Sequence, residues 1–288
     1  MKTSDTPQSI SAGIDLAVGV VRITAHETTS TSVEVFPSDD SNDEDVRAAE
    51  QTRVELTTDR LEVRGPKLRS WLSRGGGGSV TVVVSLPTGS HLDYTVGMGD
   101  VHADGRLGDC RVRTGLGQIV LDQVGTLVVK SGAGKVQVEH VSGSVEITDG
   151  SGSVRVGQIE GTALIKNSNG ETWVGEAHRD IRVKAANGSI AIDHTHADVS
   201  ATSANGDVRL GAVERGSVDI KTAMGDLEVG IRDGVPAWID ANATAGTVRN
   251  ALEASGAPDP SADTVEVTAR TTVGEIHIKR ANQTGATS

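Results

Sequence analysis

The sequence predicts an all-β protein, a β-solenoid of about ten two-strand rungs of about 18 residues each. We expect the solenoid over residues 91–279, an N-terminal β region over 1–90 and a disordered polar tail over 280–288. Three observations predict this fold. A glycine before an x-apolar-x-apolar phrase recurs at nearly constant intervals, and apolar residues stand at fixed offsets from it. Glycine is abundant, at 35 residues, whereas aromatic residues make up only 2% of the chain. The core must therefore come from many small, regular contacts joined by tight turns.

Ten marker glycines define the repeat. They are Gly99, Gly117, Gly134, Gly152, Gly170, Gly188, Gly206, Gly225, Gly246 and Gly274, at intervals of 18, 17, 18, 18, 18, 18, 19, 21 and 28 residues. The positions two residues after and seven residues before each marker are apolar, apart from Thr172. Each unit therefore holds two short strands whose side chains alternate between the interior and the surface.

Stacking explains why the units are so alike. A single unit leaves its backbone donors and acceptors unpaired, whereas stacked units bond to the units above and below. The Asn-Gly pairs at 169–170, 187–188 and 205–206 provide the turns, because both residue types tolerate positive φ. Asn-Gly is also a hairpin signal, so an antiparallel meander is the alternative. The nearly constant unit length favours the solenoid, because stacking penalises each departure.

Residues 1–90 follow a different rule. Their alternating apolar stretches lie at 17–25, 32–36, 53–63 and 80–86. The acidic segment 39–51 carries three consecutive acids from Asp43, which suit the first turn of a helix. We predict a small β layer that covers the first rung and protects its open strand edge.

The phrases of the repeat also carry a family resemblance. They include "SANGDVRL" (203–210), "TAMGDLEV" (222–229) and "TTVGEIHI" (271–278), after an N-terminal region that ends in "VTVVVSLPTG" (80–89). With these phrases the chain resembles the bacterial "putative adhesin" β-strand-repeat family, a domain-of-unknown-function family. The resemblance implies the repeat fold and attachment to a surface, and it implies no catalytic residues.

Charge and composition bear on several function classes. The net charge of −12 opposes binding to nucleic acid or to anionic membranes. No apolar run is long enough to span a bilayer, and no export signal is visible, so the expected location is the cytoplasm. The single cysteine, Cys110, excludes an intrachain disulfide and falls in an inward column. We expect it to behave as a small buried apolar residue rather than a nucleophile.

An outward column of cations lies four residues before the markers. Its members are Arg113, Lys130, Lys166, Lys184, Lys221 and Arg270. The column could face an acidic partner, although nearby acids favour a mixed, solvated face. Trp173 lies outward beside Arg155 of the preceding rung and is a candidate contact anchor, unless Arg155 covers it.

The two longest intervals add residues at one corner of the solenoid, in the segments 230–240 and 250–264. Loops on one edge of a scaffold often carry binding surfaces, and Trp238 is the aromatic candidate there. A capping segment or a tolerated insertion is the alternative reading of both loops.

Metal and catalytic chemistry has little support in the sequence. His194 and His196 would share one face of an extended segment, a feasible pair of transition-metal ligands, but no third ligand is indicated and a solvated turn is favoured. A calcium-binding β-roll needs an acid after each marker, and Lys135 breaks that column. We therefore expect no catalytic residue, metal or cofactor.

These observations favour a non-enzymatic structural or protein-interaction scaffold. Its expected partner is an unidentified protein or a second copy of the chain. An adhesin-like surface protein is the first alternative. A carbohydrate-active enzyme that uses the loops within 230–264 is the second.

Overall fold

The computed structural model describes residues 1–66, 78–252 and 263–281. The chain divides into two compact units, each described by itself below. Unit 1 comprises Met1–Gly143 and Thr148–Gly150, and unit 2 comprises Ser144–Ile147 and Ser151–Ser288. Both units are built almost entirely of β-strands, which confirms the predicted all-β class and its solenoid-like character.

Unit 1 contains the single helix of the described residues, α1 (Asp43–Gln51). Its strands are β1 (Lys2–Asp5), β2 (Ser11–His26), β3 (Ser30–Pro37), β4 (Arg53–Leu56), β5 (Arg60–Arg64), β6 (Val80–Pro87), β7 (His91–Met98), β8 (Val101–Arg106), β9 (Cys110–Leu116), β10 (Ile119–Val124) and β11 (Leu127–Val141). Strand β12 (Val145–Asp149) contains residues of both units.

Unit 2 contains only strands. They are β13 (Gly152–Ile159), β14 (Ala163–Asn169), β15 (Thr172–Ala177), β16 (Ile181–Asn187), β17 (Ile190–Thr195), β18 (Val199–Asn205), β19 (Val208–Val213), β20 (Gly216–Met224), β21 (Leu227–Ile231), β22 (Ala237–Ala245), β23 (Val248–Asn250), β24 (Val265–Val273) and β25 (Ile276–Arg280).

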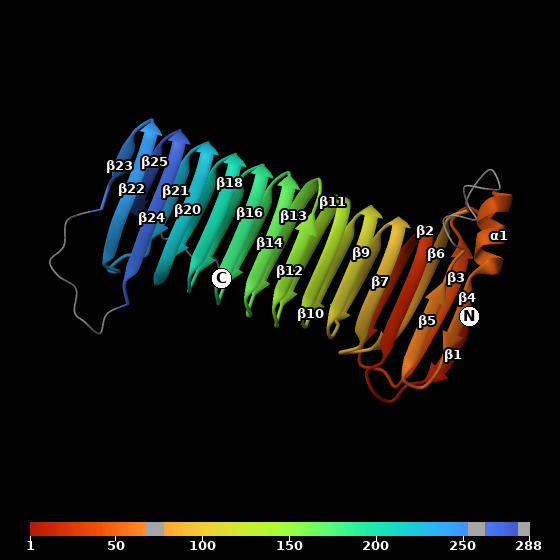
Figure 1. Cartoon of the computed structure of the whole chain (residues 1–288). Coiled ribbons are helices and arrows are strands. Elements are labelled where there is room, and N and C mark those ends of the chain that lie inside the picture. Colours follow the sequence, from red (N-terminus) through yellow and green to blue (C-terminus); the bar gives the residue numbers. More distant parts are fainter. Residues whose placement is uncertain (67–77, 253–262, 282–288) are drawn as a thin grey trace. The chain divides into compact units, whose positions relative to one another are not determined.

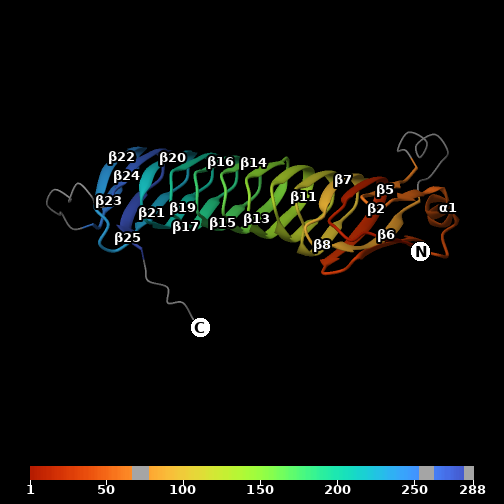
Figure 2. The ribbon, with the colours of Figure 1, turned by 90° about the horizontal axis from the view of Figure 1, so that it is seen from below.

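Parallel pairing between successive units of the repeat decides between the two predicted architectures. The first strands of successive units form one sheet, sheet B, in which Ile181 pairs with Val199. The second strands form the other, sheet A, in which Ile190 pairs with Val208. Figure 2 shows β15, β17, β19 and β21 of sheet A side by side. The antiparallel meander is therefore wrong for the repeat.

In unit 1 the 16-residue strand β2 forms a complete rung by itself. Its first half pairs with β7 in sheet B, and its second half pairs with β8 in sheet A. On its other side β2 pairs in parallel with β5 and β6, and the outer strands β1, β3 and β4 pair antiparallel. Part of the N-terminal region is thus continuous with the parallel stack, rather than a separate layer laid over it.

The predicted helix start is also found. Asn42 caps α1 by accepting a hydrogen bond from the backbone of Glu44 at 2.9 Å. The buried carboxylate of Asp45 accepts hydrogen bonds from the backbone N–H groups of Asp39 and Ser79, at 3.0 and 2.8 Å. These bonds tie the helix to the segments on either side of it, and α1 packs against β3 and β6.

In unit 2 the order of the rungs in space departs from their order in the sequence. Strand β24 lies between β20 and β22, and β25 lies between β21 and β23. The last two strands of the chain are therefore inserted into the stack, and β22 and β23 form its terminal rung (Figure 1).

The core consists of inward columns of aliphatic side chains. Ile181, Val199 and Val218 lie above one another in sheet B and are at most 2% exposed. Cys110 is buried in the same way, and burial raises the pKa of its thiol to about 12, with a smaller contribution from the charge of Asp109. Such a thiol is protonated at neutral pH, as expected for an inert core residue.

All ten marker glycines have a positive φ, and no other residue type does among the described residues. A Cβ on Gly188 would lie 2.0 Å from the carbonyl oxygen of Gly170, so successive turns approach too closely for a side chain. The asparagines before these glycines have negative φ, contrary to expectation, and pair with one another instead. Asn187 donates to Asn169 at 2.9 Å, and Asn205 donates to Asn187 at 2.8 Å.

A polar column runs inside unit 1, three residues before the markers, and includes Thr114, Ser131 and Asp149. Asp149 is 1% exposed, and hydrogen bonding from Ser131 and the backbone of Gly150 only partly offsets the burial of its carboxyl group. Burial raises the pKa of this carboxyl group above its ordinary value.

We expect D149N to be more stable than the natural chain at neutral pH, by a margin that grows as the pH rises. In the natural chain the folded state favours the protonated carboxyl of Asp149. The stability that this preference adds is fully present below the ordinary aspartate pKa of about 3.9, and it is lost as the pH rises through the pKa of the folded state. Thermal unfolding of both chains between about pH 3.5 and 8 measures the margin. A difference in Tm that stays constant across this range would contradict the prediction.

Candidate functional site

The predicted cations do form an outward column in each unit. Lys130 pairs with Arg113 in unit 1, and Lys184 pairs with Lys166 in unit 2, all four exposed. Lys221 is exposed as well. Several of these side chains already have acidic partners: Arg113 lies 3.4 Å from Asp93, and Lys221 lies 2.9 Å from Asp219. Exposed ion pairs of this kind contribute little stability.

Trp173 is covered rather than free. The guanidinium of Arg155 lies 5.9 Å from the centre of its ring, and its indole N–H donates to Asp193 at 3.1 Å. The side chain is half-buried by these neighbours. Local contacts thus satisfy Trp173, as the alternative reading expected, whereas Trp238 is 70% exposed.

The terminal rung of unit 2 presents an open strand edge. Strands β22 and β23 each have one neighbour among the described residues, β24 and β25. Ile239 and Ala241 continue the inward column of sheet B but are only half-buried, while their partners in β24, Val267 and Ala269, are 0% exposed. Val248 continues the column of sheet A and is 44% exposed. Within the described residues, the stack therefore ends on a partly exposed apolar surface, and no strand pairs with the outer edge of β22 and β23.

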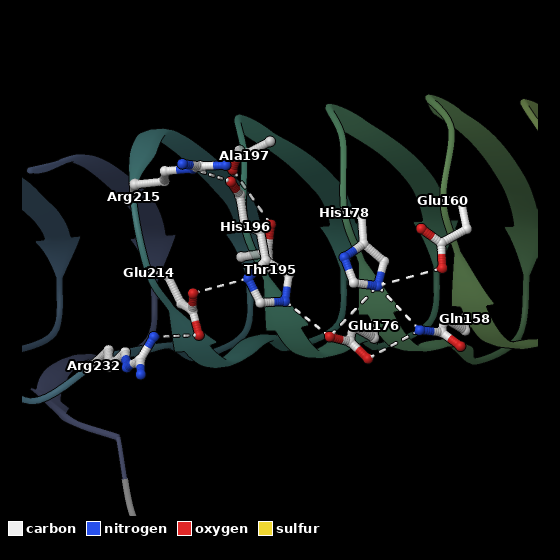
Figure 3. Close-up of polar contacts among 10 residues, drawn as sticks. All are labelled: Gln158, Glu160, Glu176, His178, Thr195, His196, Ala197, Glu214, Arg215 and Arg232. Atoms are coloured by element: carbon white, nitrogen blue, oxygen red, sulfur yellow. Dashed lines mark hydrogen bonds and ion pairs between the residues drawn. The ribbon is translucent and has the colours of Figure 1, made fainter. Parts of the chain in front are cut away.

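A second feature of unit 2 is a ladder of histidine and glutamate side chains (Figure 3). We call it the His–Glu ladder, and its members are Glu160, Glu176, His178, His196 and Glu214. Glu176 lies near the end of β15, and the other four follow the second strand of four successive rungs. Because equivalent turns stack, these side chains lie along one edge of sheet A.

Hydrogen bonds join the rungs of the ladder. Nε2 of His196 lies 2.8 Å from Oε1 of Glu176, and its Nδ1 lies 2.9 Å from Oε2 of Glu214. His178 Nε2 lies 3.6 Å from the same Glu176 oxygen and 3.7 Å from Glu160. The two imidazole rings stack, with centroids 4.9 Å apart and planes 6° apart. Glu176 is thus shared by two histidines.

The charges around His196 favour its protonated form. Partial burial lowers the pKa of this imidazole, but the hydrogen bonds and charges of Glu176 and Glu214 outweigh burial and raise it above its ordinary value. Arg232 lies 2.9 Å from the other oxygen of Glu214, and Arg215 donates to the backbone carbonyl of His196 at 2.8 Å. The site is therefore a chain of alternating glutamate and histidine side chains, with Arg232 and Arg215 in contact with its Glu214 and His196 members.

The structure corrects the histidine pair considered from the sequence. His196 contacts Glu176, Glu214 and His178, whereas His194 is exposed and is not a member of the ladder. Sequence reasoning missed Glu176 and His178. The signal was present, because the residues eight positions after four successive markers are Glu160, His178, His196 and Glu214.

Comparison with known proteins locates the chain among related sequences and folds. The Toastrack DUF4097 family model matches residues 13–288. No match is found among curated proteins. Among the described residues, no helix has the length and apolar character needed to cross a membrane.

Several solved structures are similar along most of their length. A putative cell adhesion protein from Clostridium sporogenes is 13% identical, with 97% of this chain and 98% of that chain covered and a TM-score of 0.23. A putative adhesin from Bacteroides fragilis is 13% identical, with coverages of 96% and 95% and a TM-score of 0.34. A putative adhesin from Parabacteroides merdae is 10% identical, with coverages of 97% and 94% and a TM-score of 0.39.

Proposed function

The chain belongs to the Toastrack DUF4097 family, and from that premise we propose that it is a non-enzymatic β-solenoid module whose partner is a second copy of itself. In this proposal the rungs are the two-strand units marked by the ten glycines. The family resemblance drawn from the repeat phrases is confirmed by this membership. The observation that carries the proposal is the open terminal rung formed by β22 and β23.

An open strand edge of this kind favours association. Its unpaired N–H and C=O groups can pair with another strand, and folded proteins usually cover or charge such edges. Here the inward positions Ile239, Ala241 and Val248 are apolar and partly or largely exposed. Pairing with another rung would bury them and satisfy the backbone at once.

A second copy suits this edge because it offers the same pattern. In the proposed dimer, two copies of β22 pair antiparallel about a two-fold axis that passes through Ala241. Each side chain that points inward then lies opposite an inward side chain of the other copy. An axis perpendicular to both sheets would bring β23 toward its counterpart in sheet A as well. Both sheets would then continue through the interface.

We expect the natural chain to sediment as a dimer, with twice the chain mass of 29.7 kDa, and we expect I239K and V248K to sediment as monomers. A lysine at either position places a charge where the two apolar columns meet, one in each sheet. K166E, in the middle of the outward cation column, is the matched control and should remain dimeric.

Sedimentation velocity over a range of concentrations distinguishes the outcomes. If the natural chain stays monomeric at the highest concentration, the proposed association is wrong. Dimers of unchanged strength in both lysine variants place the contact elsewhere and also contradict it. Circular dichroism of each variant shows that the β fold is retained.

We propose adhesion to a surface as the second function, and the resemblance of the repeat phrases to the putative adhesin family supports it. Fractionation of cells that express the chain tests it. Recovery in the envelope fraction supports adhesion, and recovery only in the soluble fraction argues against it.

A further inference from the structure

The His–Glu ladder brings three metal-ligating side chains together without any contribution from the terminal rung. One ligand atom each from Glu176, His178 and His196 lies within 4.8 Å of the other two. All three side chains are half-buried. The ladder borders a surface groove that His178, His196, Asp198 and Arg215 help to line, so an ion can reach it from solvent.

We propose that Glu176, His178 and His196 form a binding site for a divalent transition metal of the Zn²⁺ type. Two imidazole nitrogens and one carboxylate oxygen are the donor set that zinc takes in open, three-ligand sites, with water in the fourth position. Calcium and magnesium prefer sites made only of oxygen, so the two histidines select against them.

The distances between the ligand atoms suit a zinc site after small movements of the side chains. Donor atoms in a tetrahedral zinc site lie about 3.3 Å apart, since the bonds are about 2.0–2.1 Å long. The two nitrogen-to-oxygen distances to Glu176, 2.8 Å from His196 and 3.6 Å from His178, bracket that value. The rings are stacked 4.9 Å apart, so each must tilt toward the other to direct its Nε2 at one ion.

The neighbours of the site are placed as outer partners of metal ligands. Glu214 accepts a hydrogen bond from Nδ1 of His196 at 2.9 Å, so Nε2, which now donates to Glu176 at 2.8 Å, is the nitrogen that would bind the metal after losing its proton. Arg232 in turn holds Glu214 at 2.9 Å. Gln158 lies 3.0 Å from Nε2 of His178 and donates to it, so that nitrogen is in its acceptor form and the ion would displace the Gln158 amide when it binds. Carboxylate–histidine–metal arrangements of this kind fix ring orientation and strengthen the ligand.

Calorimetric titration of the full chain with ZnCl₂, after treatment with a chelator, tests the proposal. We expect one Zn²⁺ per chain, and we expect H178A and H196A each to weaken binding by at least about 100-fold. E214Q removes only an outer partner and should weaken binding by about 10-fold. H194A, at the exposed neighbour of His196 in the sequence, is the matched control and should bind as the natural chain does.

A second readout separates ligation from indirect damage. Co²⁺ in a tetrahedral site with nitrogen and oxygen ligands absorbs visible light, and we expect that band in the natural chain and in H194A but not in H178A or H196A. Thermal unfolding without metal shows whether each variant is folded. A folded natural chain that binds neither ion overturns the proposal, and so does undiminished binding in folded H178A or H196A. The result does not depend on the oligomeric state, so this experiment tests the metal site separately from the proposed self-association.

Discussion

Replacement of Gly188 by alanine is expected to lower the free energy of unfolding of unit 2 by about 4 kcal/mol. The residue has a φ of +150°, which non-glycine residues rarely adopt. The added Cβ would also stand 2.0 Å from the carbonyl oxygen of Gly170. Relief of that overlap must move two stacked turns apart and strain the hydrogen bond between the N–H of Gly188 and the carbonyl of Asn205, now 2.8 Å long.

The matched control is G234A. Gly234 also has a positive φ, +81°, but a Cβ there would have no heavy atom within 4 Å. We therefore expect a loss of only about 1–2 kcal/mol, from the backbone conformation alone. Urea unfolding followed by circular dichroism measures both variants. Equal losses in the two would mean that the close approach of successive turns contributes nothing, contrary to the prediction.

The same close approach explains why so much of the fold can be predicted from the sequence. A glycine is required wherever successive turns touch, so the markers at Gly170, Gly188 and Gly206 record the stacking directly. The aliphatic columns record the inside of the stack, because Val208 and its equivalents must fill the same space in every rung. Turn chemistry was predicted less well, since asparagine serves there by pairing with the asparagine of the next rung rather than by adopting positive φ.

The candidate sites depend on polar side chains, whose positions the apolar repeat pattern does not predict. His178 and His196 are 18 positions apart, and only a reading of the column eight residues after each marker brings them together. Whether such side chains stack or point into solvent depends on the corner geometry, which apolar periodicity does not specify. The polar column that includes Asp149 was likewise invisible, because a strand's inward positions are expected to be apolar.

The order of the last rungs could not be predicted for a different reason. The strands 216–224, 237–245 and 265–273 share one alternation, so each can pair with either of the others at similar energy. The interval of 28 residues between the last two markers indicates a long connection but not where it leads. Insertion of β24 and β25 places Val267 at 0% exposure and leaves Ile239 half-buried at the end.

We expect the double variant K221C/R270C to form a disulfide on mild oxidation, and K221C/N242C to form none. Lys221 and Arg270 are paired on neighbouring strands, and Arg270 in turn pairs with Asn242. Neighbouring strands lie about 4.8 Å apart, within the range of Cα separations that a disulfide spans, whereas two strand spacings are about 9.6 Å and exceed it. If the rungs followed the sequence order, the outcome would be reversed, because β22 would then lie beside β20.

Peptide mapping by mass spectrometry after oxidation identifies the bond that forms. K166C/K184C is the positive control, because those residues pair across two regular neighbouring rungs. The native Cys110 should not compete, since it is 2% exposed and burial raises the pKa of its thiol to about 12. A bond between positions 221 and 242, with none between 221 and 270, would refute the inserted rung. It would also remove the open edge of β22 and β23, because the last strands of the chain would then close the stack themselves.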